Sequence, residues 1–288
     1  MASGILIVDK PAGWTSQDVV SKLRGVLHEK RVGHGGTLDP MATGVLPVFV
    51  GRATRAVEFF EHADKTYEAT LRLGLTTDTQ DTTGTVLETR PVDIDEAALR
   101  AVLPRFTGVL QQLPPMYSAV KIGGKKLYEL ARAGKEIERK PREITVFSID
   151  LLDFSSNSAC LRVHCSKGTY IRTLCHDIGA ALGCGGCMAA LRRVQAGAYT
   201  LADAVSLDDI VAHPAPQSLL KPVDTLFAAL PCLTLTPAQE KCVRNGAAFT
   251  CKSGAGRCRA YARDGEFLAL CEVSDGTLKT VKSFFDPV

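Results

Sequence analysis

The residues best suited to chemistry lie in one glycine-rich segment, Gly33–Gly44, which also contains His34 and Asp39. Glycine lets a backbone approach a ligand closely, and Pro40 favours an extended conformation at Asp39. A carboxylate held in this way suits covalent or acid–base catalysis. The same composition also fits a structural turn with an Asx hydrogen bond, or a loop that cradles phosphate. The pattern alone leaves these interpretations open, although no Gly-Lys-Ser/Thr follows, so it is not a Walker loop.

A second chemical feature is the basic segment from Lys121 to Glu143. It holds eight lysines and arginines against four glutamates, a local surplus of four in a chain whose formal net charge is +3. Such a segment is either a solvated surface or an arm that contacts phosphates. The charge of the whole chain is too small to indicate nucleic-acid binding by itself.

The ten cysteines form a third group, and all of them lie between Cys160 and Cys271. In a chain of this length they indicate reduced thiols rather than a disulfide framework. Cys184 and Cys187 have the spacing of one metal-binding pair, with His176 and Cys165 nearby in sequence. A structural zinc site needs four ligands, so we expect no metal there, nor at the pair formed by residues 251 and 258.

Alternating strand and helix signals predict the elements that position these residues. Residues 15–18, Thr-Ser-Gln-Asp, resemble a capping box before a helical apolar pattern. A second helix is expected over 171–182, with Gly183 as its C-cap. The expected strands cover residues 4–8, 45–50, 67–73, 144–154 and 159–165. We expect a loop over 31–43, a short helix over 95–103 and a helical stretch over 206–227 that is interrupted by prolines.

The C-terminal part has a different pattern. Three short alternating runs, 256–262, 267–273 and 278–284, are separated by Asp264-Gly265 and Asp275-Gly276, which are typical of β-hairpin turns. We place a domain boundary near Leu230-Pro231. The predicted domains are therefore residues 1–230 and a small β domain, 231–288.

Composition limits the class of protein. The 288 residues are 45% hydrophobic and 23% charged, as in a globular protein with about two domains, which excludes a disordered chain or a collagen. No stretch approaches the ~20 apolar residues of a membrane span. The N-terminal apolar run ends at Asp9 and Lys10, too early for a signal peptide. We expect a cytoplasmic protein without membrane contact.

Several ordered blocks within about the first 200 residues resemble the TruB family of tRNA pseudouridine synthases. They are Asp9–Ser16 with its Lys-Pro pair, Val32–Pro47, Lys65–Tyr67, Thr77–Asp81, Pro115–Tyr128, Cys165–Thr173 and Leu191–Arg193. Gly35 departs from the pattern, since many relatives have Thr or Ser there, and we expect only the stiffness of the loop to change.

The resemblance implies an α+β pseudouridine synthase fold, in which helices flank a mixed central β-sheet. It also implies an RNA-contacting insertion at about 115–143 and, by position and size, a PUA-like C-terminal domain. The implied reaction isomerises uridine to pseudouridine at position 55 in the T-loop of tRNA, with the base flipped out of its stack. Substrate and product are isomers, so no cofactor is expected.

The same resemblance assigns roles to residues. Asp39 matches the essential aspartate, the nucleophile, and could attack C1′, attack C6 or remove a sugar proton. Arg172 orients that carboxylate. The substrate-binding residues are His34, Tyr67, Tyr170 and Leu191. Lys10 and Asp81 have supporting roles, and the RNA contacts are Lys121, Lys125 and Lys126.

The expected partner is tRNA, through its T-loop and elbow, and the expected state is a monomer. Two alternatives remain. One is an RNA-binding or RNA-folding module in which catalysis is secondary. The other is the catalytic subunit of a guide-RNA ribonucleoprotein, but the chain begins just before its Lys-Pro motif and ends at Asp286-Pro287-Val288 without a basic tail, which favours the stand-alone bacterial type.

Overall fold

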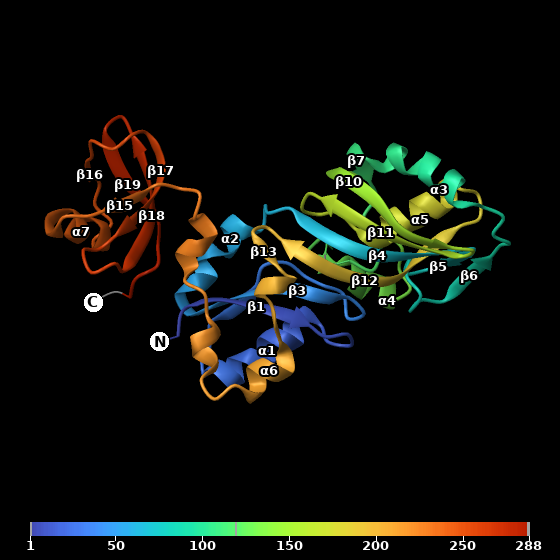
Figure 1. Ribbon diagram of the computed structural model, residues 1–288, viewed down its shortest axis with the longest axis horizontal. Coiled ribbons are helices and arrows are strands. Elements are labelled where there is room, and N and C mark those ends of the chain that lie inside the picture. The colour runs from blue at the N-terminus through green and yellow to red at the C-terminus, as the bar shows by residue number, and fades with distance from the viewer. Residues whose placement is uncertain (1, 119, 287–288) are drawn as a thin grey trace.

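The computed structural model describes residues 2–118 and 120–286 (Figure 1). The side chains at positions 121, 126 and 132 also lie outside the description. A mixed ten-stranded sheet runs through the larger part of the molecule, and a five-stranded sheet forms the C-terminal end. The predicted α+β class with a mixed central sheet is confirmed.

The large sheet has the strand order β14-β1-β3-β12-β4-β11-β10-β7, with β2 added at β3 and β13 added at β12. It is mixed because β12 runs parallel to β3, and β14 parallel to β1, while the other pairs are antiparallel. Its strands are β1 (Gly4–Lys10), β2 (Val32–His34), β3 (Thr43–Val50), β4 (Lys65–Leu73), β7 (Gly108–Gln112), β10 (Arg142–Ser155), β11 (Ser158–Cys165), β12 (Gly186–Ala196), β13 (Tyr199–Thr200) and β14 (Val205–Ser206).

Smaller sheets complete the strand inventory. Two short hairpins pair β5 (Leu75–Thr77) with β6 (Val86–Thr89), and β8 (Lys121–Ile122) with β9 (Lys125–Lys126). The C-terminal sheet comprises β15 (Cys232–Thr234), β17 (Gly256–Tyr261), β18 (Phe267–Ser274), β19 (Thr277–Ser283) and β16 (Phe249–Thr250).

Helices are short and lie beside the sheets (Figure 1). The α-helices are α1 (Ser16–Leu27), α2 (Val57–Phe60), α3 (Glu96–Val102), α4 (Leu127–Arg132), α5 (Ile171–Ala181), α6 (Leu207–Ala212) and α7 (Pro237–Arg244). The 3₁₀ turns are η1 (Gly51–Ala56), η2 (Leu103–Phe106), η3 (Leu201–Asp203), η4 (Pro216–Leu219) and η5 (Val223–Phe227).

Helix α1 forms for the reasons its sequence indicated. Thr15 accepts from the Asp18 amide, and the Asp18 carboxylate accepts from the Thr15 amide, so the predicted capping box is present. Val19, Val20 and Leu23 lie on its buried face, against the sheet. The start of α1 is thereby fixed next to the glycine-rich segment.

Strand β4 shows the expected alternation. Tyr67, Ala69, Leu71 and Leu73 are buried, and the residues between them are more exposed. Helix α5 covers this part of the sheet by packing on β12 and β4. The buried face of β4 therefore lies in the core, and its first apolar residue, Tyr67, lies at the end nearest the site described below.

Two local expectations were wrong. Residues 32–34 form β2, paired with Val50, Phe49 and Val48 of β3, rather than a loop. The 206–227 region is α-helical only in α6, because prolines remove amide donors and leave short 3₁₀ turns. The helix expected over 171–182 is present as α5, which begins after Tyr170 without a side-chain cap.

The C-terminal sheet contacts the rest of the chain through aromatic side chains. Phe227 of η5 lies 5.5 Å from Phe59 of α2 and 6.0 Å from Phe284, measured between ring centroids. An ion pair, Arg52 with Asp286, joins the same two regions. The three predicted strands are present, and α7 was not expected. The domain boundary at 230 and the PUA-like classification stay predictions.

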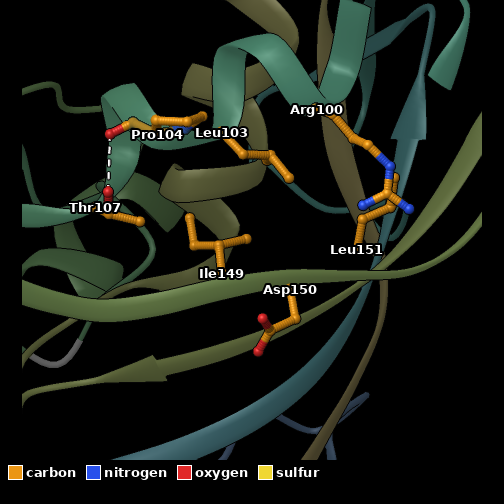
Figure 2. A pocket seen from close by; sticks show the side chains of 7 residues that line it. All are labelled: Arg100, Leu103, Pro104, Thr107, Ile149, Asp150 and Leu151. Atoms are coloured by element: carbon orange, nitrogen blue, oxygen red, sulfur yellow. Dashed lines mark hydrogen bonds between the residues drawn. The ribbon is translucent and has the colours of Figure 1, made fainter. Parts of the chain in front are cut away.

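A groove of about 340 Å³ lies where η2 crosses β10 (Figure 2). Its walls include Leu103, Ile149 and Leu151, with Arg100 and Asp150 at its edges. None of its lining residues belongs to the expected site. In the described part of the chain, no helix is long and apolar enough to cross a membrane.

Candidate functional site

The backbone on both sides of Asp39 is fixed by other elements. The Ser16 hydroxyl, at the start of α1, accepts from the Leu38 amide at 2.8 Å and donates to the Leu38 carbonyl at 3.1 Å. The Pro40 carbonyl accepts from the Gly13 amide at 2.8 Å. The position of the carboxylate therefore depends on helix α1 and the turn before it.

Arg172, in the first turn of α5, holds the Asp39 carboxylate. Its Nε lies 2.9 Å from Asp39 Oδ2, and its side chain is only 6% exposed, against 36% for Asp39. The guanidinium also donates to the carbonyls of Thr79 (3.2 Å) and Tyr117 (2.9 Å), and its Nη1 lies 3.6 Å from Asp81 Oδ2. Because four groups orient the guanidinium, it presents one edge to Asp39 in a fixed direction.

The acidic loop supplies the second carboxylate. Asp81 is buried and accepts hydrogen bonds from the Thr79 hydroxyl (2.8 Å), the Thr83 amide (3.0 Å) and the Thr83 hydroxyl (2.5 Å). Two backbone hydrogen bonds to Met188 attach the loop to β12. Asp81 thus steadies both its own loop and Arg172.

The surroundings of Asp39 shift its titration. Burial raises the pKa of Asp39 above its ordinary value of 3.8, the Arg172 guanidinium opposes that rise, and Asp81 adds to it. The ionised form is therefore maintained chiefly by Arg172. The carboxylate faces a partly open site, as its 36% exposure indicates.

Two strands bring the other expected substrate residues together. In the pairing of β4 with β12, Tyr67 lies opposite Arg193 and Ala69 opposite Leu191. Alternation puts Tyr67 and Leu191 on the same face of the sheet, where both are buried. Burial raises the pKa of Tyr67, so its phenol is neutral.

Tyr170 and His34 are held in place by different hydrogen bonds. The Tyr170 amide donates to Gln112 Oε1 at 2.8 Å, and Gln112 Nε2 donates to the Tyr170 carbonyl at 3.0 Å, so this buried side chain fixes the backbone of the residue that precedes α5. His34 Nδ1 accepts from the Gly36 amide at 3.3 Å. Burial, and then Arg193, lower the pKa of His34, which favours the neutral imidazole.

Lys10 is completely buried, and its ammonium donates to the carbonyls of Pro11 (2.9 Å), Trp14 (2.6 Å) and Pro40 (3.3 Å). Burial lowers its pKa from 10.5 to about 8, although Asp39 opposes the change. The contact with Pro40 brings Lys10 to the segment that carries Asp39.

The three lysines expected to contact RNA lie in the β8–β9 hairpin. Lys125 is exposed, and the side chains of Lys121 and Lys126 lie outside the described residues. The insertion contacts the site at the Tyr117 carbonyl, which accepts a hydrogen bond from Arg172.

The sequence did not single out Arg193, which the structure buries beside Tyr67. Alternation along β12 places residue 193 on the same face as Leu191, but it does not predict that a charged residue is buried there. The expectation for Gly35 was also wrong, since a Cβ there would lie 2.5 Å from the ring of Phe60. The position is limited by space and not only by stiffness.

Among the described residues, no group of three or more His, Cys, Asp or Glu side chains is arranged to hold a metal ion. All ten cysteines are free thiols.

Comparisons with known proteins identify the family of the chain. The N-terminal domain model of the TruB family pseudouridylate synthases matches residues 24–171, and the tRNA pseudouridylate synthase B C-terminal domain model matches 172–228. The tRNA pseudouridine synthase B of Azoarcus sp. (strain BH72) is 46% identical over 97% of this chain and 94% of that protein. That of Thermobifida fusca (strain YX) is 45% identical over 99% of each.

Solved structures share the fold. A chain of a Cbf5-Nop10-Gar1 complex is 27% identical, with a TM-score of 0.75, over 99% of this chain and 85% of that chain. A chain of an H/ACA RNP bound to a substrate RNA containing 2'-deoxyuridine has a TM-score of 0.74 at 24% identity, over 99% of this chain and 86% of that chain.

Proposed function

The chain belongs to the TruB family of tRNA pseudouridine synthases, which isomerise uridine to pseudouridine, and we propose that its target is uridine 55 in the T-loop and that Asp39 is its nucleophile. The observation that carries the proposal is the Asp39 carboxylate, partly open to solvent and paired at 2.9 Å with the buried Arg172. Among the expected site residues, Asp39 combines a fixed backbone, an orienting cation and access for a ligand.

The reaction breaks the N1–C1′ bond, turns the uracil and forms a C5–C1′ bond, after which C5 loses its proton and N1 takes one up. Attack at C1′, attack at C6 and removal of a sugar proton each require an ionised carboxylate. Arg172 favours that ionised form against the effect of burial. Atoms balance without a redox partner or energy donor, in accord with the expected absence of a cofactor.

The base must leave the T-loop stack before it can reach Asp39, at a cost of a few kcal/mol. In our proposal the Tyr67 ring stacks on the flipped uracil, while Tyr170 and Leu191 line its pocket. The neutral His34 occupies space beside the base. Lys10 and Asp81 fix the segments that carry Asp39 and Arg172.

We further propose that the protein acts as a cytoplasmic monomer without guide RNA, gripping the tRNA elbow with the basic segment at 121–143. Curated relatives that match over nearly the whole chain are named tRNA pseudouridine synthase B, at 44–46% identity. The ribonucleoprotein chains that match share only 24–27% identity. A requirement for a guide RNA or for protein partners would contradict this part.

The proposal that uridine 55 is the target is tested by mapping pseudouridine in a tRNA transcript. A tRNA transcript is incubated with the protein alone, then treated with a carbodiimide that marks pseudouridine, and the stops of primer extension are located. We expect one new stop at position 55, and none in a transcript with cytidine there. A stop at another uridine, or activity that survives the cytidine substitution, would overturn the assignment.

A further inference from the structure

Arg193 is a buried cation without an obvious charge partner. It is 1% exposed, and among the described residues no carboxylate lies within ion-pair distance of it. Its titratable neighbours include Lys10, His34 and Lys65, whose pKa values it helps to lower. A buried guanidinium in such surroundings is unfavourable unless its hydrogen bonds are well made.

The hydrogen bonds of Arg193 join separate segments. Its Nε donates to the Val45 carbonyl in β3 at 2.7 Å, and its Nη2 donates to the Gly36 carbonyl in the glycine-rich segment at 3.1 Å. Arg193 is also the direct partner of the buried Tyr67 in the pairing of β12 with β4, and its positive charge opposes the effect of burial on the pKa of the Tyr67 phenol. One buried guanidinium therefore bonds the segment that carries Asp39 and belongs to the residue paired with Tyr67.

The backbone geometry makes this junction rigid. Arg193 is the Cα partner of Tyr67 on one side and of Gly44 on the other. At Gly44, where φ is +99°, an added Cβ would lie 2.2 Å from the Arg193 carbonyl oxygen. Strands β3 and β12 thus approach too closely for any other residue, and Arg193 has little room to move.

We propose that Arg193 is a positioning residue, whose guanidinium sets the Tyr67 ring at a fixed distance from the segment that carries Asp39. The inference rests on the proposed function, because it assumes that Tyr67 stacks on the uracil and that Asp39 reacts with it. A planar guanidinium has five N–H donors, so it can bond two carbonyls and a hydroxyl that lie in one plane. An ammonium cannot reproduce that arrangement, although it keeps the charge.

The test is a double-mutant cycle between Arg193→Lys and Tyr67→Phe, with single-turnover rates and tRNA affinities for each protein. Phenylalanine keeps the aromatic ring and removes only the hydroxyl, the one group of the Tyr67 side chain that can accept from a guanidinium. We expect Arg193→Lys to lower the maximal rate 10- to 100-fold, since small displacements of reacting groups have effects of about this size. Affinity for tRNA is expected to change less than threefold.

In the Tyr67→Phe protein, Arg193→Lys should lower the single-turnover rate by a factor at least threefold smaller than in the wild type. The reason is that the hydroxyl that could bond the guanidinium is already absent. Equal effects in both backgrounds, or a wild-type rate for Arg193→Lys, would overturn the inference. If Arg193→Lys does not fold, Arg193→Gln replaces it in the same cycle. Arg162→Lys is the matched control, because Arg162 on the neighbouring strand β11 is half exposed and pairs with Glu68.

The two proposals fail in different ways. Activity that survives Asp39→Asn would contradict the proposed function, whatever the cycle gives. Loss of activity in Asp39→Asn together with additive effects in the cycle would contradict only the role of Arg193.

Discussion

At the scale of single residues, the site depends on one guanidinium shared by two carboxylates. Arg172 lies 2.9 Å from Asp39 and 3.6 Å from Asp81, and carbonyls occupy its remaining donors. The buried Asp81 therefore holds Arg172 in place while Asp39 keeps the direct contact.

Arg172→Lys tests whether geometry, and not only charge, is needed. Lysine keeps the positive charge but cannot hold Asp39 and two carbonyls in one plane. We expect a fall of about 100-fold in the single-turnover rate with little change in tRNA affinity. Arg100→Lys, at an exposed arginine paired with Glu96, should leave the rate unchanged. A near-normal rate for Arg172→Lys would show that the charge alone suffices.

Lys10 makes a second prediction, in the pH dependence of stability. Its pKa is about 8 in the folded protein, below the ordinary value of 10.5, so the unfolded chain binds more protons between these values. Stability contributed by Lys10 must therefore rise as pH rises from about 8 to 10.5. The difference between the two pKa values of Lys10 corresponds to about 3 kcal/mol in the free energy of unfolding.

Urea unfolding of the wild type and of Lys10→Met at pH 8 and pH 10 measures this effect. The stability difference should move in favour of the wild type at the higher pH. A difference that is independent of pH would contradict the buried, easily deprotonated state of Lys10.

At the scale of elements, sequence patterns correctly predicted the helices and strands whose formation depends on residues close together in the sequence. The capping box fixed the start of α1, and alternation predicted β4. Strand β2 was missed because it has three residues, one of them glycine, and exists only through pairing with β3. Helix α7 was missed although Thr236 and Gln239 form a capping box.

In the site, too, features set by one segment were predicted, and contacts between distant segments were not predicted from local patterns. Asp39 was a candidate from its own segment, whereas its contact with Arg172 joins distant parts of the chain and came only from the family resemblance. Arg193 was missed because a charged residue in a strand is normally expected to face solvent. Its burial follows from the close approach of β3 and β12, which no local pattern encodes.

The start of α5 gives a prediction at this scale. Gln112 supplies both hydrogen bonds to the Tyr170 backbone, so Gln112→Met should lower the free energy of unfolding by about 1–3 kcal/mol. The rate should fall as well, since Arg172 lies two residues beyond Tyr170. Gln111→Met, at the exposed neighbouring position, is the control for calorimetric melting. Equal melting temperatures for the two variants would refute the capping role of Gln112.

At the scale of the whole molecule, the basic insertion lies along the chain between the acidic loop and α5, and the C-terminal sheet lies at the far end (Figure 1). Within the described residues, the insertion meets Arg172 through the Tyr117 carbonyl, which accepts a hydrogen bond from the guanidinium at 2.9 Å. We therefore expect the insertion to determine affinity for tRNA, and the residues around Asp39 to determine the rate of isomerisation.

Lys125→Gln tests that division. Each phosphate contact contributes about 0.7–0.9 to the slope of log affinity against log salt. For Lys125→Gln we expect the slope of log affinity against log salt to be smaller by about that amount. The single-turnover rate at saturating protein should be unchanged. Lys22→Gln, at an exposed lysine of α1, should keep the wild-type slope. A changed rate with an unchanged slope would place Lys125 outside the RNA contact.

The most direct test of the central claim uses tRNA labelled with tritium at uridine C5, incubated with the wild type or with Asp39→Asn and no added cofactor. C5 loses its hydrogen only when it becomes the new glycosidic carbon. We predict release of about one equivalent of T-loop tritium by the wild type, and none by Asp39→Asn, which should still bind tRNA. Release by Asp39→Asn at the wild-type rate would contradict the account, as would tight binding by the wild type without any release.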